Sequence, residues 1–131
     1  MDELTAIAAR VADRDHGGAR GPWTLELYPT LLCNLSCGFC DSTVRHQRPV
    51  GELSAARMLA LIDEAAALGA RRVMILGGGE PLLAPHTVDV MRRAKTLGLS
   101  GMLTTNGTLL GATTAAALVE MAWDEVHISV D

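Results

Sequence analysis

The sequence lacks any run of basic residues. Its eleven Lys and Arg residues are outnumbered by fifteen Asp and Glu, and the formal net charge at pH 7 is -4. A protein that binds nucleic acid or an anionic membrane surface through charge normally presents a basic patch. The composition therefore argues against nucleic acid and against a membrane as partners.

Long hydrophobic runs are missing as well. Charged side chains recur among the first twenty residues, from Asp2 and Glu3 to Asp15, and they leave no apolar segment of the kind that a secretory signal peptide needs. No later segment reaches the roughly 18 apolar residues that cross a bilayer. We therefore expect a cytoplasmic protein.

Cysteine is absent outside one short stretch. The segment TLLCNLSCGFCDS, residues 30–42, holds Cys33, Cys37 and Cys40, which are the three cysteines of the sequence. The cytosol keeps thiols reduced, and an odd number of thiols cannot all pair, so the cluster indicates metal or redox chemistry rather than a disulfide framework.

The spacing C-x3-C-x2-C limits the kinds of metal group that the cysteines can bind. Soft thiolates suit an iron–sulfur cluster or zinc, and both normally take four ligands. With three cysteines, a cluster with one open coordination position is favoured over a closed structural zinc site. A zinc site would need Asp41 or His46 as its fourth ligand, and three purely structural thiols fit poorly in so loop-like a stretch.

The hydrophobic pattern predicts strands alternating with helices. At 131 residues and 49% hydrophobic residues, the chain is long and apolar enough for one core. Periodicity, the candidate cap Ser54 and the helix-ending glycines Gly69 and Gly98 mark the elements. We expect helices at 3–15, 54–69, 86–97 and 113–122, strands at 23–29, 71–76, 100–105 and 125–131, and a flexible linker completing residues 1–22.

Alternating strands and helices predict parallel pairing with right-handed crossovers. Gly69 and Gly98 lie 29 residues apart, close to the roughly 31 residues of one βα unit in a closed barrel. The fold class is therefore α/β, a partial parallel (β/α) barrel of TIM-like type. Four strands make only a segment of such a barrel, so we expect the chain to be part of a longer protein.

Polar motifs follow each predicted strand, at the end where parallel barrels carry their chemistry. The cysteines follow the first strand, GGGEP the second and TNG the third, while Ser129 and Asp131 end the fourth. Alternation along the last strand turns Val126, Ile128 and Val130 toward the helices and His127, Ser129 and Asp131 toward the interior. The sequence thus predicts a single functional site at the C-terminal ends of the strands.

These motifs together resemble the radical S-adenosylmethionine superfamily over residues 23–131. The three cysteines, with Phe39 before the last, match its signature, and residues 78–81 match its GGEP element. Residues 105–107 and 129–131 stand where members often carry TNG and SLD. Because the family core usually has six strands, residues 23–131 correspond to the N-terminal part of that core.

The resemblance implies a four-iron four-sulfur cluster held by Cys33, Cys37 and Cys40, with S-adenosylmethionine on the remaining iron. Reductive cleavage would give methionine and a deoxyadenosyl radical that abstracts hydrogen from a substrate. By the same resemblance, the cofactor is bound by Phe39 near the adenine, by Gly78, Gly79 and Glu80 at the methionine amino group, and by Thr105 and Ser129 at the ribose or carboxylate.

The resemblance also implies partners. A reductant such as a flavodoxin or ferredoxin would deliver the electron, and the substrate would be an unidentified peptide or small molecule. Two other hypotheses remain open from the sequence: a small zinc-binding interaction module, and a fragment that folds without any cofactor.

Overall fold

The computed structural model describes residues 2–15, 21–40 and 51–130, so Asp41, His46, Asp131 and residues 16–20 of the predicted linker lie outside it. Four strands form one parallel sheet in the order β1-β2-β3-β4. Its elements are α1 (Glu3–Asp15), β1 (Thr24–Leu27), α2 (Ala55–Ala67), β2 (Arg72–Ile75), the 3-10 turn η2 (Pro81–Leu83), α3 (Thr87–Thr96), β3 (Ser100–Thr105), α4 (Ala112–Glu120) and β4 (Glu125–Ile128).

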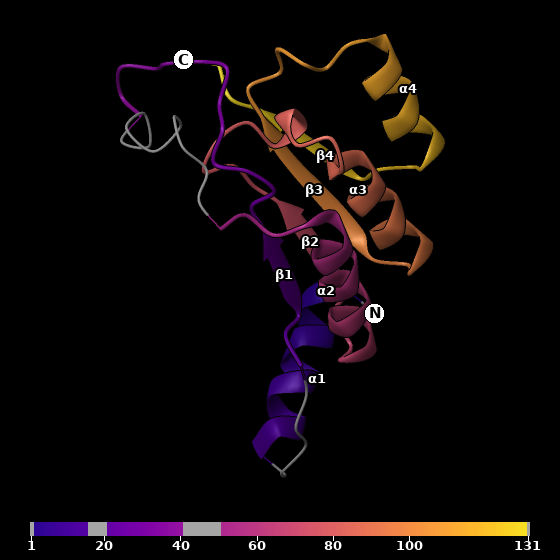
Figure 1. Cartoon of the computed structure of the whole chain (residues 1–131). Coiled ribbons are helices and arrows are strands. Elements are labelled where there is room, and N and C mark those ends of the chain that lie inside the picture. The colour runs from indigo at the N-terminus through magenta and orange to yellow at the C-terminus, as the bar shows by residue number, and fades with distance from the viewer. Residues whose placement is uncertain (1, 16–20, 41–50, 131) are drawn as a thin grey trace.

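The topology confirms the predicted segment of a (β/α) barrel. Each strand pairs with the next strand along the chain, and all three pairings are parallel. Right-handed crossovers that always advance in one direction leave their helices on a single face of the sheet. Figure 1 shows α2, α3 and α4 on that face. Between the sheet and the helices, the side chains of Ile62, Val73, Met91 and Leu103 have no exposed surface and form the core.

Local signals in the sequence set the helix ends. The Ser54 hydroxyl accepts a hydrogen bond from the backbone N–H of Arg57 at 3.2 Å, as expected of an N-cap. Gly69 and Gly98, just beyond α2 and α3, have φ of 88° and 75°, a conformation that glycine adopts at little cost. These predicted boundaries are confirmed.

Three strands are shorter than predicted: β2 by one residue at each end, and β1 and β4 mainly at their C-terminal ends. β1 ends at Leu27, whose carbonyl accepts from the N–H of Leu76 at 2.8 Å, and Pro29 has no N–H with which to extend the ladder. β4 ends at Ile128, although the N–H of Ser129 still donates to the carbonyl of Thr105 at 2.9 Å. Cys33 and Ser129 therefore lie on the loops that follow β1 and β4, rather than in the strands.

Helix α1 lies near the start of β1, away from the strand ends that carry the polar motifs (Figure 1). Arg10 joins it to the barrel segment: its guanidinium donates to the carbonyls of Gly69 and Gly21 and lies 5.3 Å from the ring centre of Trp23. Within the described ranges, no helix is both long and apolar enough to cross a membrane.

Within β4, the register confirms the predicted sidedness at Val126, His127 and Ile128, whereas Asp131 lies outside the described residues. Val126 pairs with the core residue Leu103, and His127 pairs with Thr104 on the opposite face. The side chains predicted to face the helices are nevertheless open to solvent: in β4, Val126 is 38% exposed and Ile128 55% exposed, and Val130 beyond the strand is 85% exposed. β4 is thus an apolar edge strand without cover among the described residues.

We expect the 131-residue chain to self-associate at roughly micromolar concentration and above, because an uncovered edge strand offers unpaired backbone groups to a second chain. Ile128→Lys should shift the chain toward monomer in sedimentation experiments, because Ile128 is the exposed apolar residue that ends β4. Val119→Lys is the matched control, since Val119 is 80% exposed but lies on α4. A wild-type chain that sediments as a monomer at high concentration would contradict this expectation.

Candidate functional site

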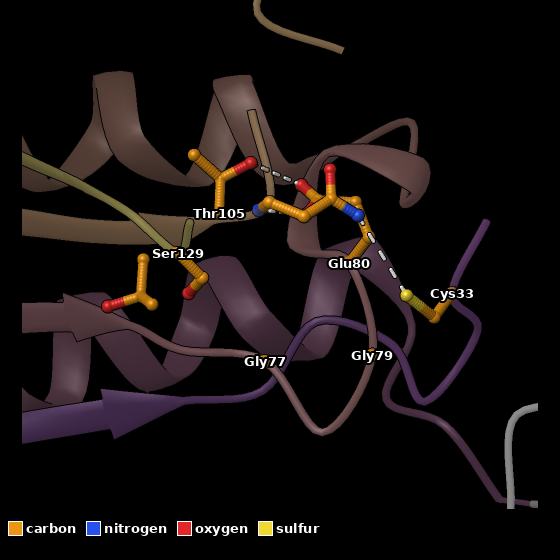
Figure 2. Close-up of a pocket in the computed structure, with 8 residues that line it drawn as sticks. Cys33, Gly77, Gly79, Glu80, Thr105 and Ser129 are labelled. Carbon is orange, nitrogen blue, oxygen red and sulfur yellow. Dashed lines mark hydrogen bonds between the residues drawn. The ribbon is translucent and has the colours of Figure 1, made fainter. Parts of the chain in front are cut away.

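The loops after all four strands meet around a pocket of about 120 Å³. Figure 2 shows side chains from these loops turned toward one another. The pocket is lined by Cys33, Gly77, Gly79, Glu80, Thr104, Thr105, Asn106 and Ser129. Five of the predicted site residues are therefore together, whereas Gly77, Thr104 and Asn106 were not predicted as site residues. Asn106 belongs to the TNG motif that follows β3.

Glu80 is the most deeply buried polar side chain that lines the pocket. It is 1% exposed, and burial of a carboxylate is costly unless its oxygens are hydrogen-bonded. Oε1 accepts from the Thr105 hydroxyl at 2.7 Å and from the N–H of Leu82 at 3.0 Å, while Oε2 accepts from the N–H of Asn106 at 2.8 Å. A carboxylate can accept about four such bonds, so Oε2 keeps capacity for one more donor.

Thr105 and Ser129 differ in what they offer to a ligand. The Thr105 hydroxyl donates a hydrogen bond to Glu80 and accepts one from the N–H of Gly107 at 3.1 Å. It therefore holds Glu80 and the following turn in place. The exposed Ser129 lines the pocket, and its backbone N–H is bonded to the Thr105 carbonyl. Of the two, Ser129 has the side chain that stands open to the pocket.

The glycines after β2 allow two loops to touch. A Cβ atom on Gly79 would lie 2.0 Å from the carbonyl oxygen of Leu32 in the cysteine loop. The N–H of Glu80 donates to that same oxygen at 2.7 Å. The family resemblance assigns Gly78 and Gly79 to the cofactor site, and the structure shows that Gly79 permits close approach of the cysteine loop.

Gly79→Ala should therefore destabilise the fold by about 1–3 kcal/mol, the usual cost of forcing extra atoms into a packed site. Gly38→Ala is the matched control in the same region, because a Cβ there meets nothing within 4 Å. Urea denaturation of both variants would test this, and equal midpoints for the two would show that the loops can separate without cost.

The three cysteines lie on the loop between β1 and α2, are half-buried and form no disulfide. Cys33 reaches the pocket, while the N–H of Cys40 donates to the carbonyl of Cys37 at 3.0 Å and closes a tight turn. Phe39 sits on this turn, is 69% exposed and does not line the pocket.

Glu52 fixes the start of the cysteine loop, and sequence reasoning missed it. Its Oε1 accepts from the Thr30 hydroxyl at 2.7 Å and from the N–H of Leu31 at 2.8 Å. No local pattern pairs these residues, which lie more than twenty positions apart. The loop thus leaves β1 in a defined direction, toward the glycines after β2.

The arrangement of thiols bears on the kind of metal group that fits. Among the described residues, no three His, Cys, Asp or Glu side chains surround a single ion position. A four-iron cluster held by three cysteines takes each thiolate on a different iron. The three cysteines lie on one loop and Cys33 lines the polar pocket, so their soft thiol groups fit such a cluster. The zinc candidates Asp41 and His46 lie outside the described residues.

The family model for the radical SAM superfamily matches residues 27–131. The chain therefore belongs to this superfamily, as the motifs predicted. Membership implies the predicted cofactors, S-adenosylmethionine and a four-iron four-sulfur cluster. It also favours the cluster over the zinc-binding module as the explanation of the three cysteines.

Similar proteins agree with this assignment. The chain is 35% identical over 102 residues to an AdoMet-dependent heme synthase of Methanosarcina barkeri, covering 78% of this chain and 29% of that protein. It is 33% identical over 108 residues to the PqqA peptide cyclase of Gluconobacter oxydans, covering 82% and 30%. The chain thus spans about a third of the length of these relatives.

A solved structure shares the fold. SuiB of Streptococcus suis, solved with S-adenosylmethionine bound, superposes with a TM-score of 0.68 at 26% sequence identity. The similarity covers 89% of this chain and 27% of SuiB. The four-stranded segment is therefore a recognisable part of a larger enzyme fold.

Proposed function

We propose that this chain is the cofactor-binding part of a radical enzyme, with Cys33, Cys37 and Cys40 as the ligands of a four-iron four-sulfur cluster. The observation that carries the proposal is the meeting of the cysteine loop with the Glu80 and Ser129 pocket at the ends of parallel strands. When bound, the cluster supplies an electron for reductive cleavage of S-adenosylmethionine, which yields methionine and a deoxyadenosyl radical that takes hydrogen from the substrate.

Glu80 is the proposed partner of the methionine amino group. The remaining acceptor capacity of its Oε2 can take one N–H of an ammonium group, and such charge-assisted bonds are stronger than neutral ones. Gly78 and Gly79 are also proposed to contact the methionine amino group of S-adenosylmethionine. Ser129 and Thr105 are the proposed contacts to the ribose or carboxylate, with Thr105 also positioning Glu80, and Phe39 is proposed to lie near the adenine.

The proposed partners are a reductant such as a flavodoxin or ferredoxin and a peptide or small-molecule substrate. A peptide is supported by two similar proteins, since one is a PqqA peptide cyclase and SuiB has been solved with its precursor peptide SuiA. The acidic net charge gives no support to nucleic acid or a membrane as partners. A reducing, cytoplasmic location would keep the three thiols available for iron.

Anaerobic reconstitution followed by metal analysis and absorption spectroscopy tests this proposal. About four irons per chain with broad visible absorbance are expected for the cluster. Bound zinc without iron would instead support the zinc-binding module. A chain that takes up neither metal would overturn the proposed function and support a fragment that folds without cofactor.

A further inference from the structure

Asn106 connects three parts of the site. Its backbone N–H donates to Oε2 of Glu80 at 2.8 Å, as described above. Its side-chain Nδ2 donates to Oδ1 of Asn34 at 2.9 Å and lies 3.9 Å from the sulfur of Cys33. Figure 2 shows the latter contact as the dashed line that reaches Cys33. One residue therefore joins the buried carboxylate to the cysteine loop.

The orientation of this amide is fixed by a ring of side chains. Oδ1 of Asn106 accepts from the N–H of Thr108 at 3.0 Å and from its hydroxyl at 2.7 Å. The ring closes because Nδ2 of Asn34 donates to the same hydroxyl at 2.7 Å. Flipping the Asn106 amide would turn its NH₂ group toward the two Thr108 donors. The donor side of Asn106 therefore faces Asn34 and Cys33.

We propose that Asn106 is a positioning residue. It holds the cysteine loop beside the buried carboxylate of Glu80 and directs a side-chain N–H at the sulfur of Cys33. The part that concerns the cluster rests on the proposed function, in which Cys33 is a ligand. Groups that orient a metal ligand affect how firmly the metal is held, and hydrogen bonds to sulfur influence the reduction potential of a cluster. A donor beside a negatively charged sulfur makes reduction easier, so Asn106 raises the potential.

The sharpest variant is Asn106→Asp. It keeps the size of the side chain and an oxygen that can accept from Thr108, but it places a second oxygen where the NH₂ group faces Asn34 and Cys33. Asn106→Ala serves as the second variant. It removes the side-chain contacts of Asn106 with Asn34, Thr108 and Cys33 without adding charge. Thr108→Val is the control, because it opens the ring but leaves the N–H of Asn106 directed at the sulfur.

Hydrogen exchange of the 131-residue chain without cluster tests the positioning role. Both Asn106 variants should speed amide exchange across residues 30–40 by about fivefold or more, as expected from loss of one ordinary hydrogen bond. Thr108→Val should have a smaller effect. Unchanged exchange in both Asn106 variants would overturn the inference, whatever the metal content of the protein.

The reconstituted chain gives the second readout. Both Asn106 variants should lose iron to a chelator about ten times faster or more, and their clusters should have lower midpoint potentials than the wild type and Thr108→Val. Unchanged potentials in both would overturn the contact between Asn106 and the sulfur. A wild-type chain that assembles no cluster would overturn the proposed function, while the exchange measurement would still decide the positioning role.

Discussion

Replacing Cys37 by Ala is expected to abolish stable cluster assembly while leaving the sheet and its helices folded. Three thiolates are the protein's whole supply of soft ligands at this site. Cys37 is half-buried on a loop outside the hydrophobic core, so its loss should not unfold the barrel segment. Iron content and visible absorbance report on the cluster, and circular dichroism reports on the fold.

Ser36→Ala is the control, because Ser36 is the exposed neighbour of Cys37 on the same loop. It should retain the iron content of the wild type. The same loss as in Cys37→Ala is expected for Cys33→Ala and Cys40→Ala. Full iron content in Cys37→Ala would refute the assignment of that cysteine as a ligand.

Glu80→Gln is expected to weaken S-adenosylmethionine binding roughly tenfold to a hundredfold without loss of iron, because a neutral amide replaces the charge that the ammonium group meets. The structure adds a second effect. Whichever oxygen becomes NH₂, it faces an existing donor: the N–H of Asn106 on one side, or Leu82 and Thr105 on the other. Stability should therefore fall by about 1–3 kcal/mol.

Thr105→Val separates these two effects. It removes the hydroxyl that donates to Glu80 but keeps the carboxylate charge, so it should lower stability with a smaller loss of cofactor affinity. Calorimetric titration and urea denaturation of both variants give the comparison. An unchanged dissociation constant for Glu80→Gln would show that this carboxylate serves only the architecture of the loops.

Much of the fold was determined by the sequence alone. Local signals mark the helix boundaries: Ser54 caps the start of α2, and Gly69 and Gly98 follow the ends of α2 and α3. These signals involve only near neighbours in the chain, so a sequence pattern can reveal them. The alternation of strands and helices, with the handedness of crossovers, implied the order of the sheet and the single site at the C-terminal ends of its strands. The cysteine spacing and the motifs after each strand then identified the family.

Only the tertiary structure decided how the site is held together. The bonds from Thr105 and Asn106 to Glu80, the packing of Gly79 on Leu32, and the ring that includes Asn34 all join different loops. Such contacts depend on strand register and on the direction in which each loop leaves the sheet. No periodicity records these quantities, because partners far apart in sequence become neighbours only when the strand ends meet.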